Sequence, residues 1–242
     1  ATSLLAATAV KDYLKANGIE GRVRYYGCPA EEGGAAKGFM VRAGLFDDVD
    51  IAISWHPGSF ASVNEPLSLA NTRIDFTFHG RASHAAASPH LGRSALDAVE
   101  LMSVGVNYLR EHIPSESRIH YAYLDAGGVA PNVVQAKAKV RYLIRAGDVK
   151  ALNSLVARVR KIADGAALMT ETTVSTQVIS AVSNLLGNSP LEQAMHDNFM
   201  RLGPPPFMAE DKDFAAEIQK EQDARVEAEQ KRKLKEFKRR KR

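Results

Sequence analysis

The sequence predicts a mixed α/β fold into which a separate α+β domain is inserted, and two observations support this class. Near the N-terminus, short apolar runs at 22–27 and 51–55 alternate with helical patterns, which is typical of a parallel sheet with helices on its faces. From residue 74 onward the expected order is strand, helix, strand, strand, helix, strand, as in the ferredoxin-like fold. We therefore expect two architectures in one chain.

The first domain is expected to open with a helix over residues 3–17, which Gly18 ends. Its opening is apolar but lacks the basic residues of a signal peptide, so we predict a buried helix. A strand over 22–27 then leads through a Gly/Pro-bounded loop to a helix over 35–43. A second strand of the same sheet is expected at 51–55.

The inserted domain is predicted to span residues 70–181. Its strands and helices are expected at 74–78, 91–111, 118–123, 138–144, 149–167 and 172–178. A helix over 191–202 then returns the chain to the first domain, which is predicted to comprise 1–69 and 182–218. Residues 219–242 are expected to form a charged basic tail that is solvated and partly disordered.

The charge distribution argues against nucleic acid as a partner. The chain has a net charge of +4, but its last twelve residues hold nine Lys/Arg and one Glu, which leaves −4 on the rest. Apart from Phe237 this basic stretch has no aromatic residue for stacking on bases.

The sequence has neither a membrane-span pattern nor a cysteine pair. No apolar run reaches the roughly 18 residues of a membrane span, and one cysteine cannot form an internal disulfide. We therefore expect a cytoplasmic protein without a membrane partner.

Two adjacent glutamates, Glu31 and Glu32, follow the predicted strand 22–27, where α/β proteins place their chemistry. On an extended segment their side chains would point to opposite sides. One carboxylate can then bind a metal ion while the other holds the water that the metal acidifies. His56 ends the second apolar run and is a further candidate ligand. The alternatives are a solvated acidic pair near a helix N-terminus and a histidine bonded to backbone.

Several ordered motifs resemble those of one enzyme family. They are Gly-Cys-Pro-Ala-Glu-Glu-Gly-Gly at 27–34 and the segments 46–50, 55–57, 82–86, 89–92 and 127–134. Together they cover roughly residues 5 to 218, and they resemble the dinuclear zinc amidohydrolases of the aminoacylase and carboxypeptidase G group. The resemblance implies an incomplete zinc-peptidase-like α/β catalytic domain with an inserted ferredoxin-like dimerisation domain.

The resemblance also implies a reaction, in which activated water cleaves the amide bond of an N-acyl amino acid such as p-aminobenzoyl-glutamate. Glu31 would be the general base, and Glu32 and His56 would bind two divalent metal ions. Zinc is favoured because imidazole suits the softer ion, with manganese or cobalt as alternatives. Cys28 is not expected to be a ligand, because a small buried thiol is the usual state of such a residue.

Three residues of the inserted domain are implied to act on the substrate. His84 would reach the active site of the neighbouring subunit and stabilise the oxyanion of the tetrahedral intermediate. Asn132 and Arg145 would bind the substrate, Arg145 through two parallel hydrogen bonds to a carboxylate. The alternatives are a histidine that caps a loop, an asparagine that stabilises a turn and a surface arginine. The expected partners are a second copy of the chain and a second hydrolase subunit.

The family's further metal ligands are not found in this sequence. Relatives of this kind carry a Cys-Gly-His run before the first helix and a histidine near their C-terminus, and neither is present. We therefore expect an internal fragment of a longer enzyme, with weak metal binding and little hydrolysis on its own. The alternative function is a catalytically inactive fragment or regulatory subunit that acts through the dimerisation domain.

Overall fold

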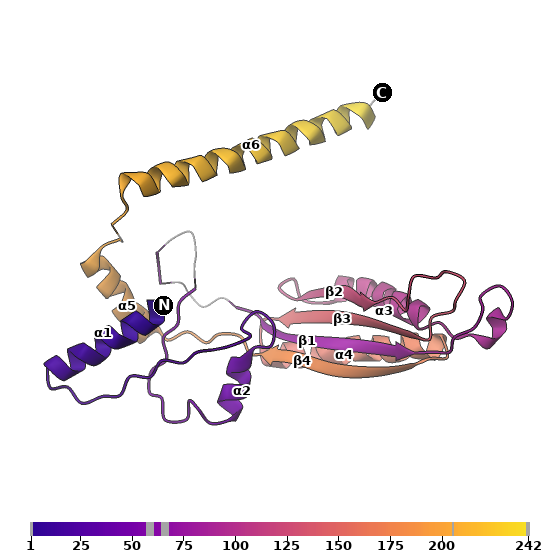
Figure 1. Ribbon diagram of the computed structural model, residues 1–242, viewed down its shortest axis with the longest axis horizontal. Helices are drawn as coiled ribbons and strands as arrows, with labels where there is room; N and C mark the ends of the chain where they lie inside the picture. The colour runs from indigo at the N-terminus through magenta and orange to yellow at the C-terminus, as the bar shows by residue number, and fades with distance from the viewer. Residues whose placement is uncertain (1, 57–60, 64–67, 205, 241–242) are drawn as a thin grey trace. The chain divides into compact units, whose positions relative to one another are not determined.

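The computed structural model describes residues 2–56, 61–63, 68–204 and 206–240 (Figure 1). The chain divides into two compact units. The first comprises Ala1–Pro57 and Asn64–Gly187, and the second comprises Gly58–Val63 and Asn188–Arg242. The sheet and all of the predicted site residues belong to the first unit.

The inserted domain is built on a four-stranded antiparallel sheet with the strand order β2-β3-β1-β4. The strands are β1 (Ala70–His79), β2 (Arg118–Asp125), β3 (Lys137–Ala146) and β4 (Thr173–Val182). The central pair runs from Ala70 opposite Ala146 to His79 opposite Lys137. Helix α3 (Ala95–Leu109) follows β1 and helix α4 (Val149–Met169) follows β3, so the predicted β-α-β-β-α-β order is confirmed.

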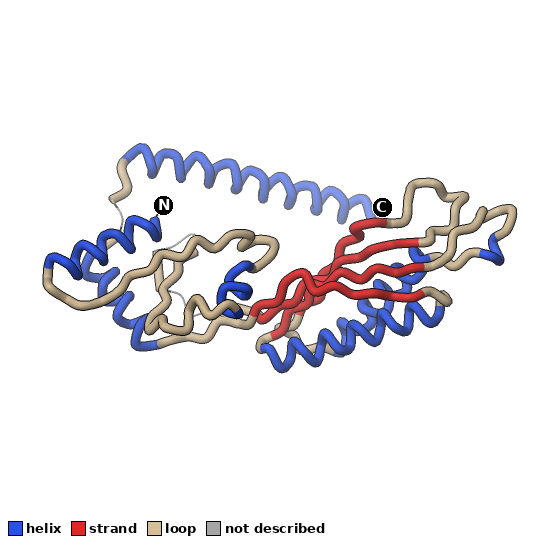
Figure 2. The backbone as a smooth tube through the Cα atoms, turned by 60° about the horizontal axis from the view of Figure 1, so that its bottom comes forward, coloured by secondary structure: helices blue, strands red, loops and turns tan. Residues whose placement is uncertain are grey.

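Helices α3 and α4 lie on one face of the sheet and enclose the hydrophobic core with it (Figure 2). Along β3, buried positions alternate with more exposed ones, which is the period of a strand with one covered face. Phe76 and Tyr142 are fully buried, and their rings meet edge to face with centroids 5.6 Å apart. Burial raises the pKa of Tyr142 to about 12, and its hydroxyl lies 3.3 Å from that of Ser103. The tyrosine is therefore neutral in the core.

Side-chain caps set where the two core helices begin. Ser94 and Asp148 each accept a hydrogen bond from the amide three residues later, at 3.1 and 2.8 Å. The sequence predicts the first of these helices at 91–111, but it starts only after Ser94. Residues Pro89–Leu91 form a separate 3-10 turn, because Gly92 has an extended backbone that interrupts the helix.

The open face of the sheet is polar, and the carboxylate of Asp75 at its centre is only 1% exposed. Arg141 donates two hydrogen bonds to this carboxylate, at 2.6 and 3.0 Å, and Lys139 Nζ lies 2.7 Å from it. Burial alone would raise the pKa of Asp75, but the hydrogen bonds from Arg141 and Lys139 outweigh burial and hold the pKa below its ordinary value. Strands β1 and β3 are thus joined by an ion network on this face.

The two strands predicted for the first domain are not formed. Residues 22–27 and 51–55 are irregular, and among the described residues neither segment has a hydrogen-bonded strand beside it. Side chains hold the first segment instead, since Arg24 donates to Asp48 at 2.6 Å. Ile53, which a covered sheet would bury, is 69% exposed. A strand needs a neighbour to satisfy its backbone groups, so these residues do not form the predicted parallel sheet.

Helices α1 (Thr2–Ala16) and α5 (Ser189–Leu202) form close to where they are predicted. No residue of α1 is buried, so the expectation of a buried helix is wrong, because its apolar side chains remain in contact with solvent. The predicted tail from residue 219 is not a separate disordered segment, since α6 (Ala209–Arg240) runs through it. Acidic residues in the first turn of α6 favour this helix through its dipole. None of the helices in the described part of the chain is both long and apolar enough to cross a membrane.

Candidate active site

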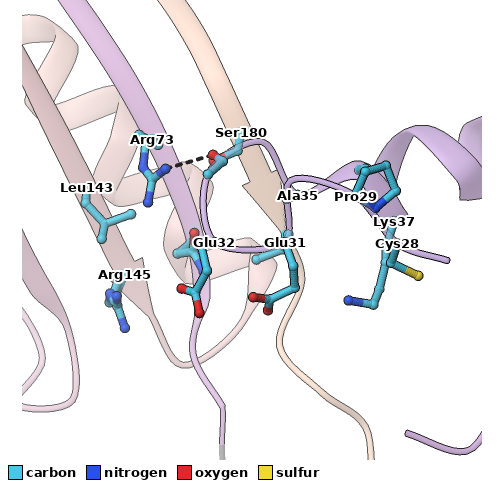
Figure 3. A pocket seen from close by; sticks show the side chains of 14 residues that line it. Cys28, Pro29, Glu31, Glu32, Ala35, Lys37, Arg73, Leu143, Arg145 and Ser180 are labelled. Carbon is cyan, nitrogen blue, oxygen red and sulfur yellow. Dashed lines mark hydrogen bonds between the residues drawn. The ribbon is translucent and has the colours of Figure 1, made fainter. Parts of the chain in front are cut away.

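Glu31 and Glu32 lie in a turn. The prediction that they lie on an extended segment is therefore wrong. The carbonyl of Ala30 accepts hydrogen bonds from the amides of residues 33–35, at 3.3, 2.8 and 2.9 Å. This closes the turn immediately before the short helix α2 (Ala36–Arg42). The two carboxylates consequently lie side by side and do not point to opposite sides (Figure 3).

The two carboxylates line a pocket of about 300 Å³ at one end of the sheet. Three strands contribute polar side chains to this pocket, namely Asn71 and Arg73 of β1, Arg145 of β3 and Ser180 of β4. Arg73 joins the turn to the sheet, because its Nη1 donates to the carbonyl of Gly33 at 2.7 Å. The acidic pair and the predicted substrate-binding Arg145 therefore share one pocket (Figure 3).

The described part of the pocket does not contain a complete metal site. His56 is exposed and is not among the residues that line the pocket. Cys28 lines it, but the sulfur points away from the carboxylates and lies 3.6 Å from the carbonyl oxygen of Tyr26. Among the described residues, no three His, Cys, Asp or Glu side chains are grouped so that they could hold a metal ion. Glu32 and His56 are not brought together, because the strands that should end side by side do not form.

His84 and Asn132 lie together in a second cluster beyond the far end of β1. The amide of Ala85 donates to the carbonyl of Asn132 at 2.9 Å, which fixes the two loops together. Nδ1 of His84 accepts hydrogen bonds from the amides of Ala86 and Ala87, at 3.2 and 3.1 Å. A neutral imidazole whose Nδ1 accepts carries its hydrogen on Nε2. The turn therefore prepares Nε2 of the exposed His84 as a hydrogen-bond donor.

The pocket and the His84 cluster lie at opposite ends of the sheet. Arg145 is opposite Asn71 at the start of β1, whereas His84 comes after His79 at the end of the strand. Ten residues at about 3.3 Å each make β1 roughly 30 Å long. Within one chain, His84 and Asn132 are therefore too far from the pocket to contact a substrate bound there.

Asn71 and Arg73 are pocket residues that the sequence reasoning missed. In β1 these two polar residues alternate with buried residues. Because successive side chains of a strand point to opposite faces, this alternation in the sequence indicates that Asn71 and Arg73 lie on the open face of the sheet. Their closeness to the acidic turn is a contact between distant segments, which no local pattern reveals. Opposite Arg73 the register of β4 shifts by one residue in a β-bulge. Bulges are frequent beside active sites, where they change the direction of a side chain.

Comparison with known proteins identifies the class of the inserted domain. Residues 70–170, which include β1, α3, β2, β3 and α4, match the family model of the peptidase dimerisation domain. The inserted domain is therefore similar to the dimerisation domain that this family model describes. It is 53% identical to a p-aminobenzoyl-glutamate hydrolase subunit of Escherichia coli over 214 residues, which are 88% of this chain and 44% of that protein.

Two further proteins show the extent of the similarity. The chain is 32% identical to Xaa-Arg dipeptidase of Mus musculus over 191 residues, which are 78% of this chain and 44% of the dipeptidase. The crystal structure of the aminobenzoyl-glutamate utilization protein from Klebsiella pneumoniae has a TM-score of 0.55 and 24% identity, with 68% of this chain and 43% of that chain covered. That likeness confirms the predicted fold class. The chain spans 44% of the length of both curated relatives.

Proposed function

We propose that the chain is part of a hydrolase that cleaves the amide bond of an N-acyl amino acid, for which p-aminobenzoyl-glutamate is the test substrate. The observation that carries this proposal is the pocket in which Glu31 and Glu32 lie with Arg145. Glu31 takes a proton from the attacking water and passes it to the leaving nitrogen. Arg145 binds the carboxylate of the amino acid through its planar fork of donors.

The family implies two divalent metal ions, with zinc first and manganese or cobalt as alternatives. Glu32 and His56 would be the ligands from this chain. Such ions, when bound, acidify water and polarise a carbonyl oxygen. The described residues do not gather the three protein ligands that a catalytic site of this kind uses.

The geometry favours an active site that two copies of the chain share. His84 donates from Nε2 to the oxyanion of the tetrahedral intermediate, and Asn132 holds the substrate. Both residues lie a full strand length from Glu31 of their own chain. If two copies pair their β2 strands antiparallel about a two-fold axis, the His84 end of one copy lies beside the Arg145 end of the other. A homodimer of this kind brings both clusters to one substrate.

The outer edge of β2 and the neighbouring surface of α3 offer the surface for this pairing. Within the described residues, β2 ends the sheet and no strand pairs with its outer side. Apolar side chains are partly exposed along both elements, and they are Tyr121, Tyr123 and Leu124 of β2 and Val104 and Tyr108 of α3. An exposed apolar edge strand is a template for another chain unless it is covered. Pairing with an identical strand covers it in both copies.

Replacing Val104 and Tyr108 together by aspartate is expected to convert the dimer into a monomer. Two carboxylates would have to lose their water in the apolar interface, which is costly without partners. Sedimentation velocity at micromolar concentration measures the change. The matched control is Val178→Asp on β4, the opposite edge of the sheet, where Val178 is 51% exposed. A dimer that survives the double substitution, or that is lost in the control, would place the interface elsewhere.

The proposed activity is tested by comparing this chain with a version extended at both ends by the corresponding segments of the Escherichia coli relative. Both are incubated with p-aminobenzoyl-glutamate in buffer that contains zinc, manganese or cobalt, and release of p-aminobenzoate is measured. We expect turnover in the extended version, with little in the chain alone because a third ligand is lacking among its described residues. An extended version that is folded and binds metal, yet hydrolyses nothing, would refute the proposal.

A catalytically inactive chain that acts through its dimerisation domain is the second candidate. Its support is the contrast within the first unit between a complete core in the sheet domain and a pocket without a group of three ligands among the described residues. The Escherichia coli relative is named as one subunit of a hydrolase, which suggests a second hydrolase subunit as the partner. On this hypothesis both versions are inactive, while the chain still forms dimers or binds that second protein.

A further inference from the structure

Arg73 lies beside Arg145 in the pocket, and among the described residues neither guanidinium forms an ion pair. The two side chains come from neighbouring strands and share the open face of the sheet. Because Asn71 is the residue directly opposite Arg145, Arg73 is its diagonal neighbour, about 7 Å away. One end of the pocket therefore carries two guanidinium groups with which no carboxylate of the described residues forms an ion pair, although Glu31 and Glu32 line the same pocket.

Both guanidinium groups have donors left over for a ligand. Nε of Arg145 is buried and has no hydrogen-bond partner among the described residues. A buried donor without a partner is unfavourable, so an anion bound in the pocket would remove a penalty that the free protein bears. Arg73 uses Nη1 for the carbonyl of Gly33 and keeps its other N–H groups for a ligand. The contact with Gly33 also ties Arg73 to the turn that carries the acidic pair.

We propose that Arg145 and Arg73 bind two carboxylates of one substrate, and that Arg73 makes the site selective for dicarboxylic amino acids. This inference rests on the proposed function, in which Arg145 binds the first carboxylate. One guanidinium suffices for a single carboxylate, since a planar fork binds both of its oxygens. Two guanidinium groups at the diagonal spacing of adjacent strands match the α-carboxylate and the side-chain carboxylate of one amino acid. A substrate with a neutral side chain leaves Arg73 without an anion and binds less tightly.

The test compares two ligands of nearly the same shape, p-aminobenzoyl-glutamate and p-aminobenzoyl-glutamine, which differ in the charge of the side chain. Their dissociation constants are measured by calorimetry with the full chain, its Arg73→Gln variant and an Arg118→Gln control. Arg118 lies directly opposite Arg145 on β2 but does not line the pocket, so it controls for the general positive field. We expect the unaltered chain to prefer the glutamate ligand by about tenfold to a hundredfold, as charged hydrogen bonds allow.

In Arg73→Gln that preference should disappear, while affinity for the glutamine ligand stays the same and shows that the variant is folded. Arg118→Gln should keep the preference. Equal weakening of both ligands in Arg73→Gln would assign Arg73 to holding the turn and overturn the inference. Equal binding of both ligands by the unaltered chain, or a preference that survives Arg73→Gln, would also overturn it and leave the proposed function intact. If neither ligand binds the unaltered chain, the inference is overturned, whereas the proposed function is decided by turnover in the extended version.

Discussion

Two inactive variants, Glu31→Gln and His84→Ala, are expected to restore activity to each other when their subunits are mixed in the extended protein. Glu31→Gln removes the proposed general base and should lower turnover by about 10²- to 10⁴-fold. His84→Ala removes the proposed oxyanion donor and should lower turnover by about 10²- to 10³-fold. In a mixed dimer, one of the two sites takes an intact Glu31 from one copy and an intact His84 from the other.

Random exchange of subunits makes half of the dimers mixed, so about a quarter of the original turnover should return. The measurement is release of p-aminobenzoate after the two variants are unfolded and refolded together. Mixing Glu31→Gln with the double variant Glu31→Gln/His84→Ala is the control, because no site in that mixture has both residues. A mixture that is no more active than the separate variants would place both residues in the site of a single copy, against the roughly 30 Å of strand that separates them.

The inserted domain was predictable because its signals are local. Apolar residues alternate along its strands, and Ser94 and Asp148 provide caps for its helices. The strands expected at 22–27 and 51–55 have an apolar content comparable to that of the strands in the inserted domain. A strand also requires a neighbouring strand, however, and the sequence of a segment does not show which strand will pair with it. These residues are therefore irregular because pairing is absent among the described residues, and not because their local pattern is weak.

Individual candidate residues of the pocket could be predicted from the sequence, but their arrangement could not. Glu31 and Glu32 were assigned from their motif and Arg145 from its place after Asn132, and the structure brings the three charged residues to one pocket. Their separation from the His84 cluster follows from the antiparallel register of β1 and β3, which no motif contains. Arg73 was missed for the same reason, because its neighbours in the pocket come from distant parts of the chain.

Breaking the ion network on the open face of the sheet is expected to lower the free energy of unfolding by about 3 kcal/mol. Arg141→Met leaves the buried Asp75 with Lys139 as its one remaining ionic partner among the described residues. Removing one partner of a buried pair costs about 3–5 kcal/mol. We expect the lower end because 36% of the Arg141 side chain is exposed and water already screens its charge. The matched control is Arg118→Met, which removes an arginine from the same face without touching Asp75.

The triple variant Asp75→Leu/Lys139→Met/Arg141→Met removes all the charges of the network at once. It should be nearly as stable as the original chain, because no buried ion is left unpaired.

The ion network should also make the free energy of unfolding depend on pH. The pKa of Asp75 in the folded state lies below its ordinary value of 3.8, so the unfolded state takes up a proton first as the pH falls. Its stabilisation is therefore complete well above pH 3.8 and is lost as the pH falls through the folded pKa. Urea unfolding followed by circular dichroism measures the free energy of unfolding at pH 7 and pH 3. Between these two pH values the original chain should lose more of this free energy than the triple variant. Equal losses in the two proteins would mean that Asp75 does not contribute to the pH dependence.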